Sequence, residues 1–286
     1  MNILAAAFCI ILFSLTVPFT RIAAMEAPPE FLILTRLLGA SLICLIVALI
    51  DGWLPPRKAW IGLISTALGS VLGFSSLTAF AMREVPSGHA AVALAAMPIA
   101  TAAYSVLRDG TRPGNKFWLY AMAGTLLSFG FFFSMSINKL LLGDLLLILA
   151  VFSAALGYVE GGRLSRSYGG KRVMTWAILC TLPVTLTFAL FYLPGSKVVL
   201  SEWSSAAWIS MGYLALISQS TGMFLWFKVL AKGPMEKMAL VQLMQPFLTL
   251  LASILLLGEH VLWPTWIIAG CVAICILGAN KEKASV

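Results

Sequence analysis

Length, composition and charge exclude a water-soluble fold. Of the 286 residues, 60% are hydrophobic and only 10% are charged, against about 25% charged residues in soluble domains. A membrane-spanning helix takes about 20 apolar residues, so the chain has room for about a dozen spans and for no sizeable soluble domain.

The formal net charge of +8 does not indicate a nucleic-acid partner, because the basic residues stand singly between apolar runs and gather into no binding face. The five cysteines also fall inside apolar runs, without a CxxC or Cys/His pattern. We therefore interpret them as packing residues, and we expect no metal and no other cofactor.

Apolar runs interrupted by Gly, Pro and charged residues predict ten transmembrane helices, because lipid admits only helices or closed barrels and these runs are too long for barrel strands. The predicted all-α spans are Ile3–Ile22, Phe31–Ile50, Trp60–Met82, Ala90–Leu107, Phe117–Ile137, Asp144–Gly161, Met174–Leu193, Ala206–Leu230, Met238–Leu257 and Pro264–Ala279.

The distribution of basic residues predicts the orientation in the membrane. With a cytoplasmic N-terminus, 14 of the 19 Lys and Arg residues fall on the inner side, which leaves Arg21, Arg36, Arg83, Lys139 and Lys197. Positively charged loops face the cytoplasm. We therefore expect a multi-pass protein of the inner, or plasma, membrane with both termini in the cytoplasm.

An internal repeat divides the chain at residues 1–138 and 139–286. At a shift of 148 residues, Pro98 meets Pro246 and Gly110 meets Gly258; the first two helices of each half align at a shift of 142 instead.

Each predicted repeat holds five helices, so the second copy must enter the membrane in the opposite orientation. Inverted repeats of this kind are common in secondary transporters, where two copies of one unit can exchange conformations around a central site.

The motifs of membrane enzymes are missing from the sequence. There is no HExxH, the three aspartates stand at loops or helix ends, and His89 and His260 are the only histidines. A Walker A loop is also absent, so neither intramembrane catalysis nor direct use of ATP is expected.

Arg36 is the first candidate for binding a substrate, because it lies about one and a half turns inside the second predicted helix. Ionisable side chains at membrane depth are costly, and the guanidinium group matches a carboxylate or phosphate with two parallel hydrogen bonds. The alternative is that Arg36 extends to the headgroups or braces a neighbouring helix.

Pro98 and Pro246 interrupt the fourth and ninth predicted helices at matching repeat positions. Paired breaks free backbone carbonyl groups and point to a central site between the repeats. A kink that serves packing alone is the alternative.

Other polar residues of the predicted spans complete the candidate site. Amide side chains at this depth need partners, and hydroxyl groups often bond within their own helix. The candidates are Ser75, Ser76, His89, Gln219, Gln242 and Gln245.

The segment from Pro246 to Gly258 and Glu259, followed by the small-residue run around Gly270, resembles the EamA-like branch of the drug/metabolite transporter superfamily. The first repeat shows the same pattern with Pro98 and Gly110, although Thr111 replaces the glutamate. The resemblance covers essentially the whole chain and implies ten spans in two repeats.

The resemblance also implies export or exchange of small metabolites. We predict a secondary exporter of a small polar or amphipathic metabolite, amino-acid-like or zwitterionic, such as a metallophore. It would work by alternating access with a small-molecule substrate and the lipid bilayer as its partners. A membrane receptor or scaffold that transports nothing is the alternative, and an intramembrane enzyme is a weaker one. The oligomeric state is left open.

Overall fold

A computed structural model describes residues 3–110, 114–136, 142–196, 202–232 and 241–258, together with five single positions between 267 and 275. Within these ranges the regular elements are all helices. The predicted tenth span and Glu259 fall largely or wholly outside the described residues, as do His260 and Thr111.

The first half of the chain forms a series of helices with short connections. Their bounds are α1 Ile3–Ser14, α2 Thr16–Glu26, α3 Pro29–Asp51, η1 Arg57–Ala59, α4 Trp60–Thr66, η2 Ala67–Gly73, α5 Phe74–Glu84, α6 Ser87–Leu94, α7 Met97–Asp109 and α8 Asn115–Ser136.

The second half follows the same plan. Its elements are α9 Leu142–Tyr168, α10 Gly170–Tyr192, η3 Leu193–Gly195, α11 Ser205–Gly212, η5 Tyr213–Gly222, α12 Met223–Leu230, η6 Gln242–Met244 and α14 Gln245–Leu257.

Five helical stretches of the described chain are long and apolar enough to cross a membrane: Leu4–Glu26, Pro29–Asp51, Arg57–Glu84, Leu142–Tyr168 and Gly170–Gly195. Large apolar side chains on their outer faces are exposed, as in Leu49 and Leu190, which are both 74% exposed. Such faces belong against lipid tails rather than water. The all-helical class is confirmed, and the number of ten spans stays a prediction.

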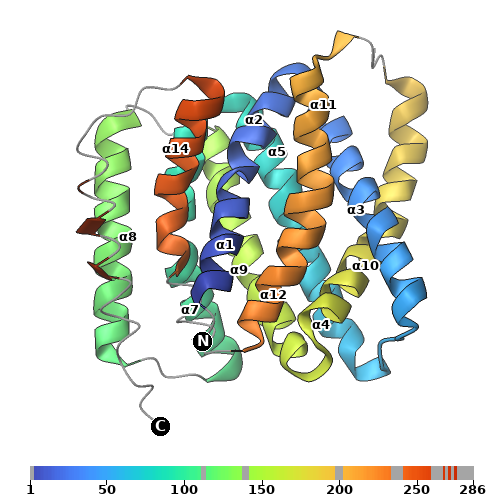
Figure 1. Ribbon diagram of the computed structural model, residues 1–286, viewed down its shortest axis with the longest axis horizontal. Coiled ribbons are helices and arrows are strands. Elements are labelled where there is room, and N and C mark those ends of the chain that lie inside the picture. Colours follow the sequence, from blue (N-terminus) through green and yellow to red (C-terminus); the bar gives the residue numbers. More distant parts are fainter. Residues whose placement is uncertain are drawn as a thin grey trace.

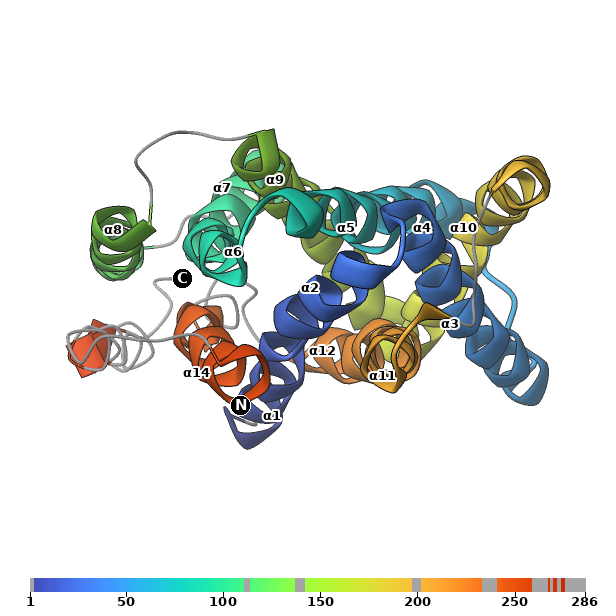
Figure 2. The same cartoon turned by 90° about the horizontal axis from the view of Figure 1, so that it is seen from above.

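Corresponding helices of the two halves run in opposite directions. In Figure 1, α4 lies at the lower side and α5 above it, whereas their counterparts α11 and α12 run from the upper side to the lower. Seen from above, α2 lies between α5 and α11 (Figure 2), and it contacts both. Helices of the two halves therefore interleave around the centre of the molecule.

The third span of each half contains a π-helical segment, η2 in the first and η5 in the second. At the 148-residue shift Ser70 of η2 meets Ser218 of η5. In η5 the hydroxyl groups of Ser220 and Thr221 each donate to the carbonyl oxygen five residues earlier. A π-helical turn is a rare feature that occurs mostly at functional sites, and here it occurs at the same repeat position twice.

Glycines bring η2 against α9. A Cβ atom on Gly69 would lie 2.6 Å from the carbonyl oxygen of Ser153 and 2.7 Å from the nitrogen of Gly157. The Ser153 hydroxyl donates to the Gly69 carbonyl at 2.9 Å. The spacings of Gly69 and Gly73, and of Gly157 and Gly161, thus serve close helix packing, which sets how near the two halves approach each other beside the central cavity.

Candidate functional site

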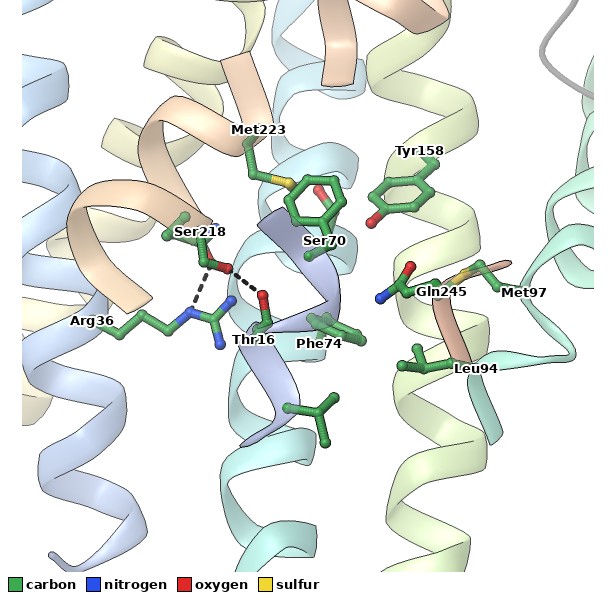
Figure 3. A pocket seen from close by; sticks show the side chains of 13 residues that line it. Thr16, Arg36, Ser70, Phe74, Leu94, Met97, Tyr158, Ser218, Met223 and Gln245 are labelled. Carbon is green, nitrogen blue, oxygen red and sulfur yellow. Dashed lines mark hydrogen bonds between the residues drawn. The ribbon is translucent and has the colours of Figure 1, made fainter. Parts of the chain in front are cut away.

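A cavity lies at the centre of the molecule, between helices of both halves. Its walls come from α1 and α2, α3, η2 and α5, the break between α6 and α7, α9, η5 and α12, and α14 (Figure 3). Its volume is only about 20 Å³, which holds about one water molecule. Small-molecule sites usually offer 300–1,000 Å³, so the cavity must widen before it can admit a metabolite.

Arg36 is the cationic side chain of this cavity, and it is 4% exposed. Its Nε donates to Oε1 of Gln219 at 2.9 Å, and the hydroxyl of Ser75 donates to the same oxygen at 3.1 Å. The shared amide oxygen fixes the guanidinium plane, and Figure 3 shows the guanidinium group turned toward Thr16.

No Asp or Glu forms an ion pair with Arg36 within the part of the chain that the structure describes. A buried charge normally has a partner of opposite sign, because removing it from water is costly. Arg36 is held by a neutral amide instead. Its terminal nitrogen atoms can therefore receive a carboxylate from a ligand.

Several cavity residues form pairs related by the repeat. Thr16 corresponds to Tyr158 at the 142-residue shift, and Ser70 corresponds to Ser218 at the 148-residue shift. Thr16 and Ser218 share a hydrogen bond of 2.9 Å between their hydroxyl oxygens. The cavity thus lies where the equivalent parts of the two repeats meet.

The charged and amide side chains of the site have no polar counterpart in the other repeat. Arg36 corresponds to Ile178, Gln219 to Val71 and Gln245 to Met97. The repeated frame is therefore nearly symmetric, but its hydrogen-bonding groups are not.

Both predicted helix breaks border this cavity. Pro98 stands in the first turn of α7 after the gap that follows α6, and Pro246 stands in the first turn of α14 after η6. The carbonyl group of Ala95, freed by the first break, accepts a hydrogen bond of 3.1 Å from the hydroxyl of Thr125 on α8. Met97 and Gln245 line the cavity directly beside the two breaks.

The two glutamines near the second break have different surroundings. The side chain of Gln245 points into the cavity in Figure 3. Gln242 is 1% exposed and lies beside Tyr158, and its amide atoms find no hydrogen bond of ordinary geometry within the described residues. Of this pair, Gln245 is the one placed to touch a ligand.

Two of the candidates lie away from the cavity. Ser76 lines a separate crevice between α3, α5 and α10. Nδ1 of His89 lies 2.6 Å from the carboxylate of Asp144, which joins α6 to the first turn of α9. The structure therefore gathers Arg36, Ser75, Gln219 and Gln245 at the central site, with Gln242 behind it.

Several lining residues were not among the candidates from sequence: Phe13, Thr16, Ser70, Phe74, Met97, Ser218 and Met223. The repeat itself was the signal that could have found three of them, because the 142-residue shift aligns Thr16 with Tyr158 and the 148-residue shift aligns Ser70 with Ser218. Aromatic and methionine side chains give the cavity an apolar wall opposite the polar groups around Arg36.

The lower ends of α7 and α9 are joined by charged side chains. Arg108 pairs with Glu160, and Nε of Arg163 lies 2.8 Å from the carboxylate of Asp109. Arg163 also lies 3.3 Å from Glu160, three residues earlier on the same helix. Together with His89 and Asp144 at the other end, these pairs hold the fourth span of the first repeat against the first span of the second.

Membrane-crossing helices in two related halves, with a polar cavity between them, define a multi-pass membrane transport protein. The sequence pattern of the EamA-like transporter family matches residues 1–135 and 141–280. The chain belongs to this family, within the drug/metabolite transporter superfamily, and the resemblance drawn from the residues around Pro246 and Gly258 is confirmed.

Two further comparisons agree with this membership. The chain is 35% identical to the uncharacterized transporter YdeK of Bacillus subtilis (strain 168) over 276 residues, which is 95% of this chain and 94% of the relative. A solved crystal structure, described only as that of a protein, matches with a TM-score of 0.72 at 16% identity and covers 97% of both chains. The latter likeness supports the fold.

Proposed function

We propose that this transporter is a secondary exporter of a small polar or amphipathic metabolite that carries a carboxylate, amino-acid-like or otherwise zwitterionic. One observation supports this substrate class above the others: Arg36 is a buried cation on the central cavity with no ion-pair partner among the described residues.

Recognition would begin with the carboxylate of the substrate. Because Gln219 holds Nε of Arg36, the two terminal nitrogen atoms are the donors that can form paired hydrogen bonds to it. The hydroxyl of Ser75 helps to hold Gln219 in place, so its role is positioning rather than contact with substrate. The apolar remainder of the metabolite would lie against Phe13, Phe74 and Met223.

Alternating access would supply the space that the closed cavity lacks. The paired π-helical segments η2 and η5, and the paired breaks before Pro98 and Pro246, are the points where these spans depart from regular α-helical hydrogen bonding. Such interruptions bend more easily than a regular helix. Equivalent bends in the two repeats would open the cavity to one side of the membrane and then to the other.

Metabolite profiling of the culture medium tests this proposal. Three strains are compared: one without the chain, one with the wild type, and one with Arg36→Lys, which keeps the charge and loses the planar pair of donors. We expect a carboxylate-bearing metabolite to accumulate in the medium with the wild type and to fall markedly with Arg36→Lys at equal protein abundance. Arg172→Lys serves as the control, because its ion pair with Asp51 lies on the surface. An unchanged medium across all strains would contradict the proposal.

A further inference from the structure

A second cavity of about 450 Å³ lies between α3, α5 and α10 and shares no lining residue with the central cavity. It is therefore far roomier than the central site. Its walls are mostly apolar and include Ile33, Leu34, Leu37, Leu72, Phe80 and Phe188.

Few groups along the crevice can form a hydrogen bond to a polar ligand. The hydroxyl of Thr185 already donates to the carbonyl oxygen of Thr181 at 2.8 Å. Glu30 is the charged residue of the lining, and it stands in the first turn of α3, at the upper end of that helix in Figure 1. Apart from the hydroxyl groups of Ser76 and Thr185, the polar part of the lining thus lies at one end of the crevice.

Side chains on the rim face outward, toward the surrounding lipid. Phe80 and Phe188 are each 40% exposed and Val184 is 54% exposed. Figure 2 shows the last turns of α10, in gold, standing away from α5. The residues involved belong to three stretches that are long enough to cross a membrane, so the medium that reaches the crevice is the hydrocarbon of the bilayer.

Charges of both signs stand at this end of the crevice. Arg83, in the last turn of α5, is exposed and stands three residues after Phe80 of the lining, and the ring of Tyr192 at the end of α10 stacks on Phe188 with centroids 5.4 Å apart. A cation and an anion at one end of the crevice suit a headgroup that itself carries a phosphate and an ammonium group.

We infer that this crevice binds one acyl chain of a zwitterionic aminophospholipid from the leaflet next to Glu30, which is predicted to be the outer one. An acyl chain gains little by leaving other lipid tails for an apolar groove, because both surroundings are hydrocarbon. An empty groove, however, forfeits the dispersion contacts of its walls. The acyl chain of the lipid fills the groove, and Arg83 and Glu30 select the headgroup.

Photo-crosslinking in nanodiscs tests the site on the wild-type protein. The probe is phosphatidylethanolamine with a diazirine in one acyl chain, and labelled peptides are mapped by mass spectrometry. We expect labels to concentrate on residues 72–80 and 184–188 rather than on the outward face of residues 42–50. Even labelling of all exposed apolar faces would overturn the inference.

Two tryptophan variants on α3 test whether the labelling depends on the crevice. Leu34→Trp places a larger side chain in the crevice and should lower labelling of residues 184–188 at least about fivefold. Leu42→Trp is the matched control on the same helix, since Leu42 is 62% exposed and lines neither cavity; it should leave the labelling unchanged. Equal labelling in all three proteins would contradict the site, and the wild-type map decides alone if Leu34→Trp does not fold.

Further experiments distinguish this phospholipid from other possible occupants of the crevice. Phosphatidylglycerol with the same diazirine chain, which lacks the ammonium group, should label the crevice less than phosphatidylethanolamine does, and Arg83→Gln together with Glu30→Gln should remove that preference. Displacement of the label by an excess of the transported metabolite would assign the crevice to substrate and overturn the lipid site. Crosslinks between two copies of the chain through residues 184–188 would assign it to an oligomer interface and overturn it as well.

Discussion

At the scale of the residue, the site depends on which side chains near the second helix break reach the cavity. Gln245 lines it, whereas Gln242 is buried beside Tyr158, with which its side chain interacts, and does not line the cavity. Loss of a hydrogen bond to a ligand typically costs about 1–3 kcal/mol.

We therefore expect Gln245→Leu to weaken substrate binding by roughly five- to 150-fold, at about 1.4 kcal/mol per decade. Gln242→Leu should leave the affinity unchanged, because this side chain does not line the cavity, and should lower the thermal stability slightly, because it removes a contact with the buried Tyr158. Binding isotherms and melting curves of the two purified variants in detergent measure both quantities. Unchanged affinity for Gln245→Leu would remove this residue from the site.

The residue-scale details that sequence could not predict have physical reasons. Ser75 and Ser76 are adjacent, yet Ser75 bonds to Gln219 and Ser76 lines the lipid-facing crevice. The π-helical turns of η2 just before them add residues to the turn and rotate the following face of the helix. A regular helical periodicity cannot anticipate that rotation.

His89 shows a different limit of sequence reasoning. Its partner Asp144 is 55 positions away and belongs to the other repeat. Both stand in the first turn of their helices, so only the packing of α6 against α9 brings them together. A polar residue in an apolar run needs a partner, but the sequence pattern does not distinguish a ligand from an aspartate.

At the scale of the element, the close approach of η2 and α9 depends on glycine. A Cβ atom on Gly157 would collide with the backbone nitrogen and the side chain of Ser70. Gly69 of η2 and Gly157 of α9 each begin a Gly-xxx-Gly spacing, which is typical of close helix packing, and the structure brings these two glycines together.

Gly157→Ala should therefore lower stability by about 1–3 kcal/mol, because one helix must move away from the other. Gly212→Ala is the control: Gly212 ends α11, and a Cβ atom there meets no neighbour within 4 Å. The control should be neutral or slightly stabilising. Equal melting temperatures for both variants in detergent would show that the contact between η2 and α9 does not need glycine.

At the scale of the whole molecule, the sequence predicted the all-helical class, the two repeats and the family. Periodic apolar runs are long-range signals that survive local irregularity, and the 148-residue shift aligns prolines and glycines that shape the backbone. The closure of the cavity could not be predicted, since it depends on how helices from both halves pack at their centre.

The orientation in the membrane is predicted from the 14 basic residues assigned to the inner side and the five assigned to the outer side. We expect both termini in the cytoplasm. A reporter fused after Val286 measures this: green fluorescent protein should fluoresce, and alkaline phosphatase should be inactive. Active phosphatase at this position would contradict the ten-span topology.

We propose that Arg36 binds the carboxylate of a transported metabolite in the cavity between the repeats. Uptake by purified protein in proteoliposomes tests it directly, with the exported acid and its carboxamide compared as competitors for the wild type and for Arg36→Gln. We expect the wild type to prefer the acid by at least about tenfold, or about 1.4 kcal/mol. Arg36→Gln should lose this preference while it still binds the amide. The same preference for the acid in both proteins would contradict the claim.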